Sequence, residues 1–90
     1  MSKQDNIKAL CEAAILKVDA AIKAHNDGQS ADLSVPMLQN VKAELGKMVE
    51  TLKPSKFKPS YPRFVMDWPD EHGLVSYLSE VAYQYGRLKG

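Results

Sequence analysis

The densest group of titratable side chains in the sequence lies between Asp67 and His72, and it could bind a metal ion or transfer protons. Asp67, Asp70, Glu71 and His72 bring three carboxylates and an imidazole into six residues. Such groups ligate divalent cations and act as general acids and bases. A metal or catalytic site usually draws on several elements, and no second acidic or histidine cluster completes this one. We therefore expect these side chains to stabilise a helix N-terminus, where free amides and the dipole favour acids, and we expect no metal and no cofactor.

Cys11 and His25 are the other side chains of catalytic type, and both lie on the core stripe of one predicted helix. Fourteen positions separate them, which is about 21 Å along an α-helix, so they cannot act together. We expect a buried thiol at Cys11 and a helix C-terminal partner at His25. The sequence has neither a Gly-rich phosphate-binding loop nor a nucleophile-elbow serine. These observations predict that the chain is not an enzyme.

The elements that position these residues are predicted to be helices. Apolar residues recur at steps of three and four over about 5–26, 34–53 and 70–88, which is the spacing of amphipathic helices. Gly28 follows the first of these segments and Pro54 the second, as expected at helix ends. The connection between the first two segments is short enough for them to pack antiparallel.

The segment 54–69 is rich in both proline and aromatic residues. Its four prolines predict an extended path without a helix, yet a disordered linker would not carry so many rings. We therefore expect an ordered strap that lies over the helical hairpin. The predicted fold is all-α, a single domain of residues 1–90 in which an antiparallel helical hairpin and a third helix are joined by this extended Pro- and aromatic-rich strap.

The first predicted helix carries a second apolar stripe opposite its core stripe. This stripe consists of Ala9, Ala13, Leu16, Ala20 and Ala24. The exposed side of a surface helix would normally be charged, so either the strap or a partner should cover it. If a second copy of the chain covers it, Ala13, Leu16 and Ala20 form the self-association face of a homodimer.

The first half of the strap alternates cations with aromatic rings. Residues 53–63 contain Lys53, Lys56, Lys58 and Arg63 with Phe57 and Tyr61 between them, and no acid. Grooves for single-stranded nucleic acids use cations for phosphates and rings for bases. Nucleic-acid domains are usually strongly basic, whereas the net charge of this chain is +1. The other interpretations are rings that pack inward beneath solvated lysines, or a surface that faces another protein.

The functional hypothesis is a small non-enzymatic protein-interaction module of the inhibitor, immunity or accessory type, with self-association as a second mode. Tyr, Trp and Arg anchor many interfaces, and the predicted partner-binding residues are Phe57, Tyr61, Arg63, Trp68 and Tyr83. The alternative is a nucleic-acid-binding protein that uses the basic and aromatic residues of 53–63. The sequence has no run of about 18–20 apolar residues, and its first residues lack the apolar run and small-residue cleavage site typical of a secretory signal. We therefore expect no membrane contact and a cytoplasmic location.

Overall fold

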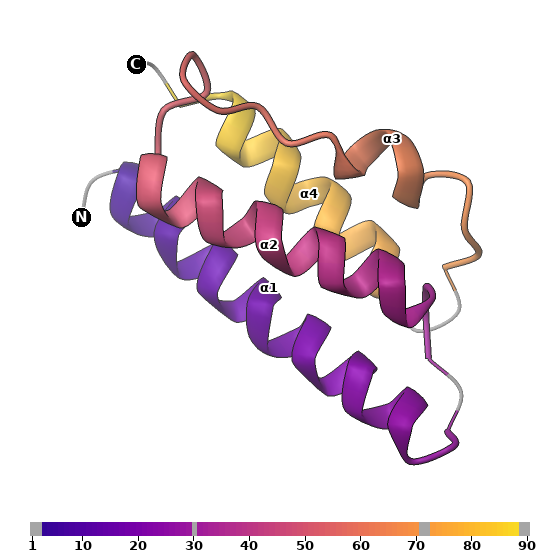
Figure 1. Ribbon diagram of the computed structural model, residues 1–90. Helices are drawn as coiled ribbons and strands as arrows, with labels where there is room; N and C mark the ends of the chain where they lie inside the picture. The colour runs from indigo at the N-terminus through magenta and orange to yellow at the C-terminus, as the bar shows by residue number, and fades with distance from the viewer. Residues whose placement is uncertain (1–2, 30, 71–72, 89–90) are drawn as a thin grey trace.

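The computed structural model describes residues 3–29, 31–70 and 73–88. These residues form four helices and no strand. The helices are α1 (Lys3–Asn26), α2 (Val35–Thr51), α3 (Tyr61–Val65) and α4 (Leu74–Gly86). Helices α1 and α2 pack antiparallel, α4 packs on α1, and the strap lies over α2 and α4 (Figure 1). The predicted all-α fold is confirmed, with its helical hairpin, its third long helix and its connecting strap.

The hairpin is held together by the core stripes predicted for its two helices. The buried residues of α1 are Ile7, Cys11, Ala14 and Val18, and those of α2 are Leu38, Val41, Leu45 and Met48. Local sequence signals define both ends of helix α2. The Ser34 hydroxyl accepts a hydrogen bond from the Met37 amide at 3.3 Å, and Leu52 adopts the left-handed conformation that ends many helices.

Gly46 destabilises helix α2, and no close packing contact requires a glycine at this position. A Cβ atom built at this position meets nothing within 4 Å, and glycine inside a helix costs about 1 kcal/mol relative to alanine. We expect Gly46→Ala to raise the free energy of unfolding by about 1 kcal/mol and the Tm by roughly 4–8 °C, measured by thermal and urea denaturation. Gly28→Ala is the control, because its φ of 79° is strained for alanine and should make that variant less stable. A lower Tm for Gly46→Ala would contradict this interpretation of α2.

The strap contains one short helix, so the prediction that the segment 54–69 holds no helix is wrong for Tyr61–Val65. Pro62 lies in the first turn of α3, where no intrahelical amide bond is lost and the fixed φ of proline suits the helix. Tyr61 and Val65 are one helical turn apart and both are buried. Helix α3 therefore exists because its prolines precede or begin it and because it brings two side chains into the core.

Glu44 of α2 fastens the strap where α3 begins. Its carboxylate accepts hydrogen bonds from the Ser60 amide at 2.9 Å, from the Ser60 hydroxyl at 2.5 Å and from the Tyr61 amide at 2.7 Å. Two of these bonds satisfy backbone amides at the start of α3, which are free at every helix N-terminus. One side chain of α2 thus holds the strap at Ser60 and Tyr61.

Two tyrosines join the strap to α4. The Tyr61 hydroxyl donates to the Leu78 carbonyl oxygen at 2.9 Å, and the Tyr85 hydroxyl donates to the Phe57 carbonyl oxygen at 2.7 Å. The strap therefore runs over α2 and α4 and not over the second apolar stripe of α1. The expectation that the strap covers this stripe is wrong, and Leu16 at its centre has an exposed fraction of 70%.

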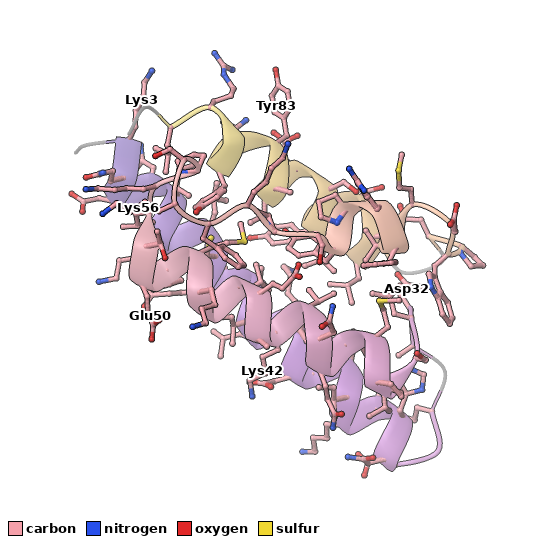
Figure 2. All side chains as sticks on the ribbon, turned by 45° about the horizontal axis from the view of Figure 1, so that its top comes forward. Lys3, Asp32, Lys42, Glu50, Lys56 and Tyr83 are labelled. Carbon is pink, nitrogen blue, oxygen red and sulfur yellow. The ribbon has the colours of Figure 1, made fainter. Side chains whose placement is uncertain are left out.

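Helix α4 begins at Leu74, later than the predicted residue 70. The N-cap residue of α4 is Gly73, whose φ is 83°. Because glycine has no side chain, it cannot accept a hydrogen bond from the first amides of the helix. Asp32, in the connection between α1 and α2, supplies the acceptor instead, since its Oδ2 atom lies 3.1 Å from the Leu74 amide nitrogen. Asp32 has an exposed fraction of only 4% and lies beside the end of the hairpin (Figure 2). A buried acid from a distant part of the chain therefore fixes the start of α4.

Candidate functional site

The structure divides the predicted partner-binding residues by their exposure. Tyr61 is fully buried and Phe57 is half-buried against the core, whereas Arg63, Trp68 and Tyr83 are exposed. Burial raises the pKa of Tyr61 well above its usual value, so its hydroxyl stays protonated and donates to α4. Tyr61 is therefore a core residue here, and Phe57 presents at most part of its ring to a partner.

Two apolar residues that the sequence interpretation did not single out are exposed beside Trp68. Phe64, Met66 and Trp68 have exposed fractions of 47%, 73% and 37%, and we call these three residues the 64–68 surface. The Trp68 amide donates to the Val65 carbonyl oxygen at 3.1 Å, which folds the chain back after α3. The signal for this surface is α3 itself, because Phe64 is turned by about 100° around the helix axis from its buried neighbour Val65.

The strap cations lie on the solvent side. Lys53, Lys56, Lys58 and Arg63 are all exposed, and Figure 2 labels Lys56 on the part of the strap nearest the chain termini. The sequence contains no acid between residues 52 and 66, and the nearby Glu44 carboxylate is already hydrogen-bonded to the strap. Phe57 and Tyr61 point inward beneath these cations. The arrangement is a positively charged ribbon without exposed rings between its charges.

Tyr83 stands apart from the strap. It projects from α4 away from the bundle (Figure 2), and the Arg87 guanidinium carbon lies 5.8 Å from the centre of its ring. This contact orders the two side chains weakly at an exposed site. The structure thus does not gather the predicted partner-binding residues into one cluster.

The acidic cluster is only partly within the described residues, because Glu71 and His72 lie outside them. Asp67 is exposed, and Asp70 accepts a hydrogen bond from the Ser76 hydroxyl. This hydrogen bond lowers the pKa of Asp70, helped by amides of the first turn of α4. Asp70 therefore accepts hydrogen bonds at the N-terminus of helix α4. No group of three or more His, Cys, Asp or Glu side chains able to hold a metal ion is found in the part of the chain that the structure describes.

Cys11 and His25 are both occupied in structural roles. Cys11 is fully buried in the core, and burial, with a smaller contribution from the negative charge of Glu12, raises its pKa to about 11. The thiol is therefore protonated at neutral pH and a poor nucleophile. The His25 Nε2 atom lies 2.7 Å from the Leu33 carbonyl oxygen, so it donates to a residue whose φ is 65°. His25 thereby ties the end of α1 to the connection that follows.

Surface hollows lie along α4, and the following are the most relevant to the predicted residues. A cavity of about 320 Å³ between α1 and α4 is lined in part by Ala20, Asp32 and Tyr77. The Lys17 ammonium covers the Tyr77 ring at 5.0 Å. A groove of about 540 Å³ lies between the strap and the C-terminal half of α4, with Lys58 in its wall.

Comparison of the chain with protein-family models, with curated proteins and with solved structures gives no match. None of the helices in the described residues is both long enough and apolar enough to cross a bilayer.

Proposed function

We propose that the chain is a protein-interaction module that binds another protein through the 64–68 surface. The observation that carries this proposal is the exposure of Phe64, Met66 and Trp68 within five consecutive residues. Single exposed apolar residues are ordinary on a protein surface, whereas apolar residues grouped together mark interaction sites. Trp and Arg are also common interface anchors, and Arg63 precedes this surface directly.

The rigid attachment of the strap supports the same proposal. Glu44 holds the strap at Ser60 and Tyr61, and the buried ring of Tyr61 holds α3 against α4. The surface is therefore ordered before any partner arrives, which reduces the entropy lost on binding. A disordered segment with the same side chains would bind more weakly for the same contact area.

The non-enzymatic part of the proposal draws its support from the state of the candidate catalytic groups. Cys11 is buried and protonated, His25 donates to a backbone carbonyl, and Asp70 accepts from Ser76. Each of these groups already has a structural role in the fold. Self-association through Ala13, Leu16 and Ala20 and a cytoplasmic location stay predictions.

Site-specific photo-crosslinking tests the proposed surface. We expect p-benzoylphenylalanine in place of Met66 to form one dominant crosslink to another protein in cells of the source organism. The same photoreactive residue at Lys47, which is exposed on α2, should form no such crosslink. Trp68→Ala should reduce the yield from position 66 by about tenfold, as expected when a hot-spot residue worth more than 1 kcal/mol is removed. Equal crosslinking from positions 66 and 47 would reject the 64–68 surface.

Nucleic-acid binding through residues 53–63 is the alternative, and the exposed cations favour it. Base stacking by the strap rings has less support, because Tyr61 is buried and Phe57 is half-buried. An oligonucleotide would then be held through phosphates alone, with an affinity that falls steeply as salt is added. Persistence of the position-66 crosslink after nuclease treatment distinguishes a protein partner from a nucleic acid.

A further inference from the structure

We infer that the groove between the strap and α4 binds a segment of the partner protein that is both acidic and apolar. This inference rests on the proposed function and gives the chemistry of the partner. The groove has a volume of about 540 Å³, within the range of ligand-binding hollows. Pro62 belongs both to its wall and to α3, so the groove adjoins the helix that carries Phe64.

The walls of the groove are apolar and stiff. The strap contributes Pro54, Pro59 and Pro62, and α4 contributes Ala82 and Tyr85. Proline rings have a fixed φ and carry no amide donor. The Tyr85 hydroxyl already donates a hydrogen bond to the Phe57 carbonyl oxygen of the strap. Such walls favour apolar side chains and lose little conformational freedom when a ligand binds.

The charge at the groove has one sign. Lys58 lines it, and none of its lining residues is acidic. Lys56 and Arg63 flank the same stretch of strap, which has no acid from residue 52 to residue 66. A complementary ligand therefore carries carboxylates beside its apolar groups.

A peptide segment fits these features better than a nucleic acid does. A single-stranded nucleic acid gains much of its affinity from rings on which its bases stack, but the Tyr85 ring in the groove wall is buried. Carboxylate-bearing side chains can reach Lys58 while neighbouring apolar side chains enter between the prolines. A partner protein can also extend from the groove along α3 to the 64–68 surface.

Peptide selection against the folded protein tests the inference. A random peptide library is selected on the full chain, and the binders are measured by fluorescence anisotropy. We expect the selected peptides to combine Asp or Glu with apolar residues. Lys58→Glu should weaken their binding by about tenfold or more, as for a charge partner worth at least 1.4 kcal/mol. Lys47→Glu on α2 is the matched control, with the same charge change away from the groove, and should leave the affinity within about twofold.

A second variant separates the groove from general charge attraction. Ala82→Trp fills the groove without changing any charge, and it too should weaken peptide binding by about tenfold. Circular dichroism and a thermal melt establish that it folds, and if it does not, the two charge variants decide. Selection of no peptide, selection of neutral or basic peptides, or binding unaffected by Lys58→Glu overturns the inference. Tighter binding of a thymidine oligonucleotide than of the best peptide overturns it in favour of nucleic acid.

The two proposals fail in different ways. If the peptides bind the Lys58→Glu variant as tightly as wild type but bind the Met66→Asp variant more weakly, the groove proposal is rejected and the 64–68 surface is kept. Acidic peptides that need Lys58, together with no crosslink from position 66, would keep the groove and reject the 64–68 surface.

Discussion

Tyr61→Ala is expected to leave the protein largely unfolded at room temperature. The Tyr61 ring is fully buried and its hydroxyl bonds to α4. Truncating a buried aromatic residue to alanine costs about 3–5 kcal/mol, which is about the whole stability that a single core gives a domain of this size. Far-UV circular dichroism and urea denaturation measure the loss directly.

Two further tyrosine variants make this result interpretable. Tyr61→Phe keeps the ring and removes only the hydrogen bond to Leu78, so it should stay folded with a loss of about 1 kcal/mol. Tyr83→Ala removes an exposed ring and should change the free energy of unfolding by no more than about 0.5 kcal/mol. If Tyr61→Ala were as stable as Tyr83→Ala, Tyr61 would not be a core residue and would return to the set of partner-binding residues.

Glu44→Ala is expected to release the strap from α2 and to lower the free energy of unfolding by about 1–3 kcal/mol. The change removes the acceptor of the Ser60 and Tyr61 amides, and the Tyr61 amide is part of a buried residue. The Tyr61 amide hydrogen bond is half-buried, and the loss of the acceptor of such a donor costs about that amount. Amide hydrogen exchange should show faster exchange over residues 60–65 than in wild type, and urea denaturation should show the loss of stability.

Glu50→Ala is the control for the Glu44 prediction. Glu50 is exposed on the same helix (Figure 2), so its removal deletes a carboxylate without touching the strap. We expect its exchange pattern over residues 60–65 to match wild type. Unchanged exchange in Glu44→Ala would mean that Tyr61 and Tyr85 hold the strap without help from α2.

The helical hairpin was predictable from sequence because its signals are local and repeated. Apolar residues recur over many turns of α1 and α2, and the Ser34 cap lies three residues before its partner. Helix α3 was not predictable in the same way, because five residues are too few to show a helical period and its prolines indicate an extended chain. The partner of Asp32 lies 42 positions away at Leu74, and no local pattern connects two such residues.

The missing α3 also explains why the burial of Tyr61 could not be predicted. In an extended strap, Tyr61 and Phe64 have no fixed relation to the core. In a helix, Tyr61 and Val65 both reach the core, whereas Phe64 is turned by about 100° from Val65 around the helix axis and is exposed. The aromatic and basic character of the segment is plain from the sequence. The sequence could not assign individual rings to inside or outside, because that depends on a helix formed by contact with α2 and α4.

The connection between α1 and α2 constrains the length of the chain at that point. His25 bonds to the Leu33 carbonyl, Leu33 is buried, and Asp32 reaches the first amide of α4. Surface connections generally accept inserted or deleted residues because little depends on their backbone. Here we expect a single added residue to displace Asp32 and Leu33 together and to deprive the Leu74 amide of its acceptor. Across evolution, this connection should therefore vary in the residues at its exposed tip and not in its length.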